Sequence, residues 1–303
     1  MHVMRLKLLF LSISLILLCL SIAGLWLHGL QLSVDFVGGS LIEFRLPPEK
    51  TVPSKDEVQR LVGSNWNIST TQESENSQLL VRGETLSQEQ QIAVLSAFNA
   101  EYQGTELLRA ESVGAVISRE LLMKTVTALG FVTVFILLYV WRQFSELRFG
   151  VAAVLAMLHD SIILLGTFSW LGYIGGVEVD VLFVTALLTT LSFSVHDTIV
   201  VFDRIRELRR KHASLPLLEV ADAAVLETLG RSINNSVTII VMLAALSLLG
   251  GETIRWFAVA LLVGAITGTY SSTFTAVPIV LVWEDVRVKL RFFRVQQLFS
   301  KRK

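Results

Sequence analysis

The chain has 303 residues, of which 52% are hydrophobic and only 17% are charged, and its mean hydropathy is +0.61. Apolar residues this frequent, gathered in long blocks, exclude an ordinary soluble domain and indicate a membrane protein. The 26 basic residues balance the 26 acidic ones, so no overall field points to nucleic acid, and the single cysteine, Cys19, has no partner for an intrachain disulfide.

Six apolar runs are long enough to cross a hydrocarbon core of about 30 Å. The first resembles a signal peptide because Arg5 and Lys7 precede it. Its apolar part is longer than the usual h-region and no small-x-small cleavage site follows, so we expect a retained anchor. The predicted spans are 8–28, 121–141, 149–171, 180–202, 232–250 and 256–283.

Lys and Arg are unevenly spread over the short loops, and this sets the predicted orientation. The loops 142–148 and 203–231 and the segment beyond 284 are rich in them, whereas 172–179 has none and 251–255 has only Arg255. Both termini are therefore predicted to be cytoplasmic. The basic run that follows Asp203 is interpreted as a topology anchor rather than a ligand site.

The residues between the first two spans do not form a long apolar run. They alternate between short strand and helix patterns. The order is βαββαβ, which suits a ferredoxin-like α+β module. This stretch has no His/Cys cluster, no Ser-His-Asp arrangement and no Gly-rich phosphate loop, so it favours an interaction domain over an enzyme. The predicted strands are 40–47, 65–74, 77–83 and 105–114, and the predicted helices are 53–63 and 86–102.

The expected fold is thus a membrane protein of six transmembrane helices with one α+β domain inserted after the first. The predicted parts are 1–28 (N-terminal cytoplasmic end and first transmembrane helix), 29–118 (extracytoplasmic domain), 119–283 (five-helix transmembrane bundle) and 284–303 (basic cytoplasmic tail).

Two aspartates lie inside predicted spans. Asp160 follows His159 midway along the third span, and Asp197 follows His196 near the cytoplasmic end of the fourth. A charge at this depth costs about 2.5–3.5 kcal/mol on insertion scales, so such a residue is a functional candidate by default. Asp197 also continues a helical stripe with Ala186, Thr190 and Ser194.

The fifth span opens with polar residues on one helical face, at the spacing i, i+3, i+4 and i+7: Arg231, Asn234, Asn235 and Thr238. Lipid cannot satisfy these groups, so we expect the face to look into the bundle or onto water, with Asp197 as the partner of Arg231. In the sixth span Gly264 and Gly268 form a GxxxG pair that permits close helix approach.

Three other readings of these polar residues were weighed. They could serve only to hold helices together by hydrogen bonds, and for the Asn and Ser residues this interpretation is favoured. Two aspartates could form an aspartyl protease dyad, but the flank of Asp197 is bulky. The histidines and aspartates could bind a metal, but no pair has ligand spacing, so no metal or cofactor is expected. A transporter-like relay of protons or ions remains.

Several motifs resemble one known family, in order along the whole chain. "SVHDTIVVFDRIRE" in the fourth span, which contains Asp197 and Asp203, is similar to the signature of the SecF subunits of bacterial protein translocase. Further matches are "DFVGG" with Asp35, Gly38 and Gly39, then "LHD", "TLGRSINNS", "GGETIRWFAVALLVGAITGTYSS" and the "WE" that ends the sixth span.

The resemblance implies a six-span half of an RND-like transporter, with a ferredoxin-like extracytoplasmic domain, in the bacterial cytoplasmic (inner) membrane. It implies a heterodimer with SecD that uses the proton gradient to help pull unfolded preprotein through the SecYEG channel. SecA acts upstream, and YajC and YidC are further partners. Carried over by position, the proton-relevant aspartate is Asp197 and the membrane arginine is Arg231.

The chain departs from the family pattern at three places. His196 replaces the usual Asn, Asn235 a common Thr, and Ser33 the first Gly of the motif after the first span. Gly38 and Gly39 remain and would supply the permissive dihedrals of a helix-to-strand turn. Half of an RND-type small-molecule or lipid exporter, and a purely structural assembly subunit, stay open as alternatives.

Overall fold

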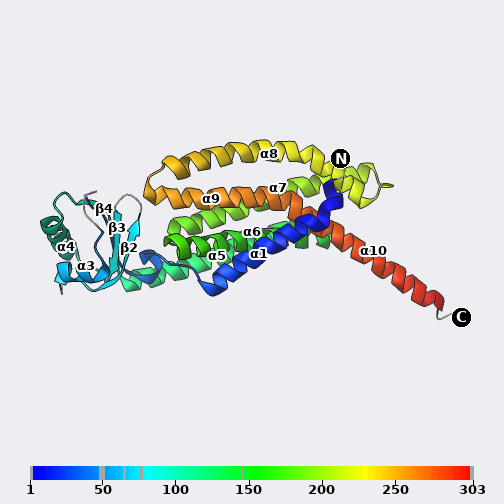
Figure 1. Ribbon diagram of the computed structural model, residues 1–303. Coiled ribbons are helices and arrows are strands. Elements are labelled where there is room, and N and C mark those ends of the chain that lie inside the picture. Colours follow the sequence, from blue (N-terminus) through cyan, green and yellow to red (C-terminus); the bar gives the residue numbers. More distant parts are fainter. Residues whose placement is uncertain (1–2, 48–51, 64–65, 75–77, 145, 301–303) are drawn as a thin grey trace. The chain divides into compact units, whose positions relative to one another are not determined.

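The computed structural model divides the chain into two compact units (Figure 1), and it describes all residues except 1–2, 48–51, 64–65, 75–77, 145 and 301–303. A helical unit comprises Met1–Leu30, Leu129–Val177 and Leu182–Lys303. An α+β unit comprises Gln31–Ala128 together with the short segment Glu178–Val181. The two are treated separately below.

The helices of the chain confirm the six predicted spans by length and composition. The sixth span is interrupted by a π-helical turn, η3. The elements are η1 (Val3–Leu6), α1 (Lys7–Leu27), α5 (Ala115–Gln143), α6 (Leu147–Gly175), α7 (Val181–Lys211), α8 (Leu217–Leu249), α9 (Glu252–Ser271), η3 (Ser272–Ala276) and α10 (Val277–Ser300).

Two helices run well past the apolar stretches that predicted them. The basic run after Asp203 is helical, since α7 ends only at Lys211. Residues 284–300 of the predicted tail continue α10, and residues 301–303 lie outside the described part of the chain. Charged side chains that reach water do not end a helix, so hydropathy marks where a span leaves the hydrocarbon rather than where its helix stops.

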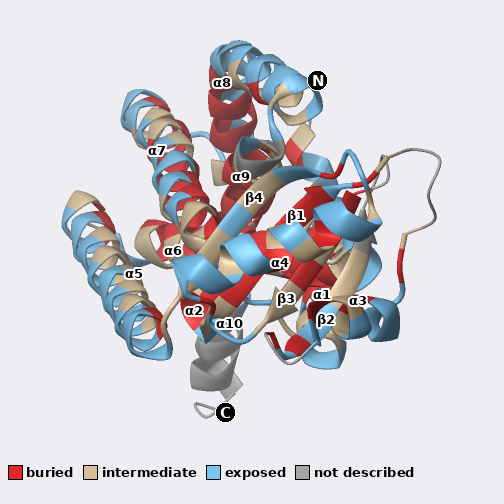
Figure 2. Cartoon of the chain, turned by 90° about the vertical axis from the view of Figure 1, so that its left-hand side faces the viewer, coloured by how far each residue is buried: buried red, intermediate tan, exposed pale blue. Residues whose placement is uncertain are grey.

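The core of the helical unit lies around α6. Small and aromatic side chains of α6 and α7 interlock there, including Phe149 and Phe202, whose ring centroids are 5.1 Å apart. On α1, Gly24 and Ser21 let the helix pack closely against α6 at Trp170 and Gly166. By contrast α5 presents exposed and intermediate side chains along most of its length (Figure 2). A helix apolar on all sides suits a lipid or protein surround.

The α+β unit confirms the predicted element order. Its sheet has the strand order β2-β3-β1-β4 with every neighbouring pair antiparallel. Residue 65 of the predicted second strand and residue 77 of the third lie outside the described residues. The elements are β1 (Gly39–Arg45), α3 (Lys55–Val62), β2 (Ile68–Ser74), β3 (Gln78–Gly83), α4 (Gln88–Glu101) and β4 (Glu106–Val113).

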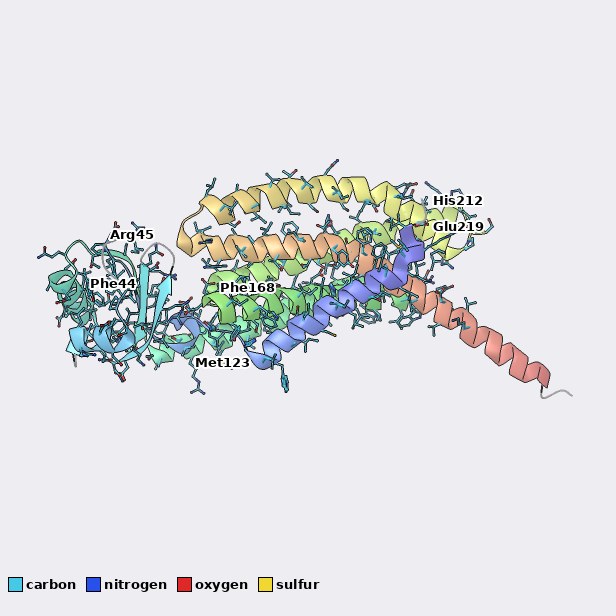
Figure 3. All side chains as sticks on the ribbon, viewed as in Figure 1. Phe44, Arg45, Met123, Phe168, His212 and Glu219 are labelled. Atoms are coloured by element: carbon cyan, nitrogen blue, oxygen red, sulfur yellow. The ribbon has the colours of Figure 1, made fainter. Side chains whose placement is uncertain are left out.

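Alternation and capping explain why these residues form this unit. Phe44 on β1 is buried and stacks on Phe98 of α4 with ring centroids 4.1 Å apart, whereas its neighbour Arg45 points outward (Figure 3). Helix α3 begins at a capping box, in which the Glu57 carboxylate accepts the Ser54 backbone N–H at 2.7 Å. That hydrogen bond holds the pKa of Glu57 below its ordinary value.

A short helix that the sequence patterns did not predict, α2 (Val34–Val37), precedes the sheet. Ser33 is its N-cap and accepts the backbone N–H of Asp35 at 3.3 Å. Gly38 and Gly39 follow with φ of +83° and +118°, so the predicted permissive helix-to-strand turn is confirmed.

Candidate functional site

Asp197 is half-buried on α7, at the end of a stripe of small residues. Ala186, Thr190 and Ser194 of this stripe are buried. The next exposed groups on the helix are His196 and Asp203. The stripe that the helical spacing predicted is therefore part of the buried side of α7. Asp197 is a half-buried position on it, since Val201, Ile205 and Leu208 further along the helix are buried again.

Gly264 and Gly268 of α9 lie against this stripe. A Cβ on Gly264 would collide with Thr190, and one on Gly268 would come within 3.4 Å of the Ser194 Cα. Side chains at these two positions would force α7 and α9 apart, so the glycines set the distance between the helices. The Ser194 hydroxyl is buried there and has no hydrogen-bond partner in the described structure.

The polar face of α8 is exposed and does not turn into this chain's own bundle, which was one of the two surroundings expected from its sequence. Arg231, Asn234 and Asn235 are exposed, and Ser232 and Ser236 are buried instead. Ser236 shares a hydrogen bond of 2.6 Å with Thr269 of α9. The reason is the size of the side chains. Serines permit close helix packing and their hydroxyls find hydrogen-bond partners there, whereas the longer Arg and Asn side chains need bulkier partners.

Asp197 and Arg231 form an incomplete pair. Within the described residues no hydrogen bond or ion pair joins them, although Arg231 and His196 are near enough to exert an electrostatic influence on the Asp197 carboxylate. Asn234 lies on the same exposed face of α8. We refer to Asp197, Arg231, Asn234 and Asn235 together as the open polar face.

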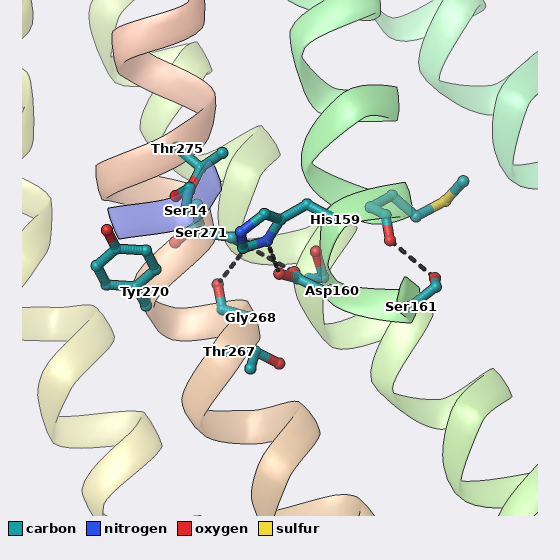
Figure 4. Close-up of polar contacts among 12 residues, drawn as sticks. Ser14, His159, Asp160, Ser161, Thr267, Gly268, Tyr270, Ser271 and Thr275 are labelled. Atoms are coloured by element: carbon teal, nitrogen blue, oxygen red, sulfur yellow. Dashed lines mark hydrogen bonds and ion pairs between the residues drawn. The ribbon is translucent and has the colours of Figure 1, made fainter. Parts of the chain in front are cut away.

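Asp160 is placed quite differently. Its carboxylate is buried, 2.9 Å from His159 Nδ1, and accepts a hydrogen bond of 2.5 Å from the Ser271 hydroxyl of α9 (Figure 4). Ser14 of α1 and Thr275 of η3 are hydrogen-bonded to each other at 2.7 Å. We refer to His159, Asp160 and Ser271 as the closed cluster, since each belongs to this chain and each is buried.

The charged residues at the C-terminal end of α7 are paired on the surface. Asp203 lies 3.3 Å from Arg206 Nη1 and 3.4 Å from Gln143 Nε2 of α5. Arg204 pairs with Glu207 and with Glu227 of α8. These contacts tie helix ends together.

The connection between α6 and α7 belongs to the α+β unit. Val179 forms a parallel bridge with Leu32, donating its N–H to Gln31 O at 2.7 Å and accepting the Ser33 N–H at 3.0 Å. Beside it Glu178 pairs with Arg82 of β3. Two hydrogen bonds and a charge pair therefore hold the segment Glu178–Val181 within the α+β unit.

Three features of the site were missed by sequence reasoning: Ser271 as the partner of Asp160, the Arg82–Glu178 pair, and the buried Arg148, which pairs with Glu284 at 2.6 Å. Each joins residues far apart in the chain, and no local pattern signals such a pairing. Two of these residues did lie in motifs noted in the sequence: Ser271 in "GGETIRWFAVALLVGAITGTYSS" and Glu284 at the end of the "WE" motif.

The described residues contain no group of three or more His, Cys, Asp or Glu side chains that could hold a metal ion. Both polar regions instead consist of carboxylates with basic, hydroxyl or amide neighbours. Groups of this kind can bind and release protons.

Comparisons with known proteins converge on one family. The family described as "Protein export membrane protein SecD/SecF, C-terminal" matches residues 93–286. A relative, the protein translocase subunit SecF of Anaerolinea thermophila, is 36% identical over 295 residues, covering 94% of each chain. SecF of Synechocystis sp. is 37% identical over 262 residues, covering 84% of this chain and 83% of that one.

Longer relatives carry two such proteins in one chain. The protein translocase subunit SecDF of Thermus thermophilus is 34% identical over 279 residues, which are 90% of this chain and 37% of that protein. The crystal structure of SecDF from the same genus and species, titled a translocon-associated membrane protein, matches with a TM-score of 0.81 and 32% identity. That match covers 94% of this chain and 39% of SecDF.

Proposed function

Since this chain belongs to the SecD/SecF family of protein export membrane proteins, we propose that it couples the proton gradient to preprotein export through the open polar face. It is a multi-pass membrane subunit with an accessory role in protein export, and SecD is its partner, as the fused SecDF relatives indicate. We assign it no chemical reaction of its own. The names of the relatives favour this role over a small-molecule exporter.

The observation that carries the proposal is the exposure of the open polar face. An Arg and two carboxamides on a spanning helix cannot be left to lipid, because each unsatisfied polar group there is costly. Arg231, Asn234 and Asn235 are exposed in the described part of the chain. We propose that SecD covers them and completes the surroundings of Asp197.

In this mechanism the state of the face follows Asp197. When Asp197 is ionised, the Arg231 guanidinium attracts its carboxylate and favours one arrangement of α7 and α8. When Asp197 takes up a proton, Arg231 loses that attraction and the two helices can shift. The α7 stripe beside Gly264 and Gly268 contains small side chains, so sliding meets little steric resistance.

Export into vesicles tests this proposal, with and without an imposed proton gradient, using complexes that contain SecD. Asp197→Asn mimics the neutral carboxyl and should abolish stimulation by the gradient while ATP-driven translocation persists. Asp203→Asn is the matched control, since this aspartate lies on the same helix, is exposed and is paired with Arg206. If Asp197→Asn responds as fully as the parent, the assignment is wrong.

We propose that the α+β unit is a ferredoxin-like domain on the outer side of the membrane that holds unfolded preprotein. The order β2-β3-β1-β4 supports this, because it is the arrangement of that fold and leaves β2 and β4 as sheet edges. An extended chain can add to such an edge by backbone hydrogen bonds. Photo-crosslinkers on β2 and β4 should capture an arrested preprotein, whereas crosslinkers on the central strand β3 should not.

Further partners and the orientation complete the proposal. We propose that the SecD pair works beside SecYEG in the bacterial cytoplasmic membrane, downstream of SecA, with YajC and YidC as neighbours and both termini in the cytoplasm. The loop charges support that orientation. Because Cys19 is the chain's only cysteine, a Cys19→Ser background permits single-cysteine labelling of each terminus and of the α+β unit. Co-purification of the native complex identifies the partners.

A further inference from the structure

The closed cluster holds two titratable side chains in a place that the proposed Asp197 mechanism does not use. His159 and Asp160 are 3% and 4% exposed, and Ser271 is fully buried. His159 Nδ1 faces Asp160 Oδ1 at 2.9 Å, while its second nitrogen, Nε2, is buried without a hydrogen-bond partner in the described part of the chain. Asp160 lies midway along α6.

No further charge lies within contact of the cluster to neutralise it. The elements packed against α6 do carry titratable or charged groups, but none of those described makes a hydrogen bond or ion pair with the cluster. They include Lys7 of α1 with Asp285 of α10, Arg148 of α6 with Glu284 of α10, Tyr270 of α9, whose hydroxyl donates to Phe10 O, and the half-buried Asp197 of α7.

Three protonation states of the pair can be compared. An ionised Asp160 beside a neutral His159 leaves a net charge at mid-span, which is costly. An ionised Asp160 beside a charged His159 is neutral overall, but the charged ring then has an Nε2–H donor with no acceptor. A carboxylic Asp160 beside a neutral His159 avoids both costs, because Nδ1–H donates to Asp160 Oδ1 and Nε2 keeps only a lone pair.

We propose that His159, Asp160 and Ser271 form a second proton-binding site, in which Asp160 is held as the carboxylic acid. The bound proton lies on Oδ2 and donates to Ser271 Oγ, 2.5 Å away. The Ser271 hydroxyl hydrogen is then free for its other acceptor, the Gly268 carbonyl at 3.3 Å. When the proton leaves, the Ser271 hydroxyl hydrogen must rotate back toward Asp160 Oδ2. The orientation of this hydroxyl on α9 therefore depends on whether Asp160 is protonated.

The position of Ser271 gives this dependence a structural consequence. It is the last residue of α9, and the π-helical turn η3 begins at the next residue. Such turns are local departures from α-helical bonding and recur at functional sites. Gly268, whose carbonyl accepts the hydroxyl, lies against Ser194 on the Asp197 stripe of α7. The site therefore connects α6, through one hydroxyl, to the helix pair α7 and α9.

Infrared spectroscopy of the SecD-containing complex in lipid vesicles tests the site directly, because a buried carboxylic acid has a C=O stretch separate from that of a carboxylate. We expect one carboxylic band to be lost in Asp160→Asn and retained in Asp203→Asn, the exposed control with the same change of charge. Ser271→Ala should keep the band but move it to higher wavenumber, because the hydrogen bond to Ser271 is gone. Ser271→Thr should restore the parent position.

Two results would overturn the proposal. One is a carboxylic region that is the same in Asp160→Asn as in the parent at every pH at which the complex stays assembled. The other is a band that depends on Na⁺ replacing K⁺ at constant pH, which would mark a cation site instead. Ser271→Ala removes only one hydroxyl, so it keeps the test open if Asp160→Asn fails to assemble.

The effect of this proton site on export rests on the proposed function, whereas the infrared band of carboxylic Asp160 does not. Ser271→Ala should reduce the stimulation of export by a proton gradient, with ATP-driven export unchanged, and Ser271→Thr should restore it. If the band behaves as expected while Asp197→Asn still responds to the gradient, the proton site stands and the Asp197 relay is wrong. If the band is absent and Asp197→Asn loses its response, the reverse holds.

Discussion

The closed cluster and the open polar face lie in the same helical unit, at spans of similar hydropathy, yet they are completed by different means. His159, Asp160 and Ser271 are buried and are linked by hydrogen bonds across α6 and α9. Arg231 and the asparagines of α8 are exposed, and Asp197 is only half-buried. In a membrane both sets need partners, and under the proposed function SecD supplies those of the open polar face.

The comparison also separates two kinds of helix contact. Where the chain packs on itself, it uses small residues: glycines of α9 against Thr190 and Ser194 of α7, and Ser236 against Thr269. Where it leaves polar groups open, it uses long side chains with charge or carboxamide ends. A small hydroxyl acts across one close helix contact, whereas an Arg or Asn side chain is long enough to reach a partner protein, which we propose to be SecD.

The largest expected effect comes from making the open polar face apolar. Asn234→Leu with Asn235→Leu should stabilise the chain when it is expressed without SecD, because the lone chain no longer exposes carboxamides to lipid. The same change should abolish assembly with SecD. Steady-state level in membranes and co-purification of SecD measure the two outcomes. Val237→Leu with Val241→Leu, exposed apolar positions on the same helix, is the control. Normal SecD binding by the Asn234→Leu, Asn235→Leu variant would contradict the assignment of the open polar face to SecD.

A smaller but still disruptive effect is expected where α7 and α9 touch. Gly264→Val places methyl groups into Thr190 and should destabilise the complex by about 1–3 kcal/mol, the usual range for overpacking. Gly130→Val on α5 is the matched control, since nothing lies within 4 Å of a Cβ there. Thermal unfolding of the complex in detergent distinguishes them, and equal shifts in Tm would contradict the close approach.

A charge pair that the chain does complete extends the comparison to the α+β unit. The side chains of Arg82 and Glu178 are 22% and 14% exposed, against 49% and 62% for Arg45 and Glu106 on the sheet surface. Removing one partner of the inner pair, as in Arg82→Gln, should destabilise the unit by about 1–3 kcal/mol. Arg45→Gln should cost less than about 1 kcal/mol.

Hydrogen exchange at the Val179 amide measures this loss, because that amide donates to Gln31 O at 2.7 Å and lies next to Glu178. Combining Arg82→Gln with Glu178→Gln should recover part of the protection, since no unpaired charge then remains. Equal exchange rates in Arg82→Gln and Arg45→Gln would show that the inner pair is no different from a surface pair.

Much of the fold could be predicted because its signals are local. Span length follows from runs of apolar residues, and the βαββαβ order follows from alternation and from capping residues such as Ser54 and Ser87. The turn at Gly38 and Gly39 follows from the conformational freedom of glycine. Each of these signals lies within a few residues of the structure it specifies.

The partners of the polar groups could not be predicted in the same way. On α8 two faces are polar, one with Ser232 and Ser236 and one with Arg231 and the asparagines, and helical spacing alone cannot say which turns inward. Packing decides, because only the serine face lets α9 approach. Asp160 and Ser271 are 111 residues apart, so their hydrogen bond is a property of the tertiary fold.

The smallest expected effect tests whether a neutral hydrogen bond between helices is mere glue. Ser236→Ala removes the 2.6 Å bond to Thr269, and such bonds are worth about 0.6 kcal/mol on average in membranes. The loss should stay small because Thr269 retains its bond to Ala265 O at 2.7 Å. Ser247→Ala is the control, since this serine bonds only to Ala244 O on its own helix among the described contacts.

Thermal unfolding of the SecD complex should therefore show a slight loss of stability for Ser236→Ala and almost none for Ser247→Ala, and both variants should bind SecD normally. If Ser236→Ala impaired SecD binding as strongly as the asparagine variant, the buried serines would belong to the interface as well. The division between polar groups that the chain completes and those it leaves open would then be drawn in the wrong place.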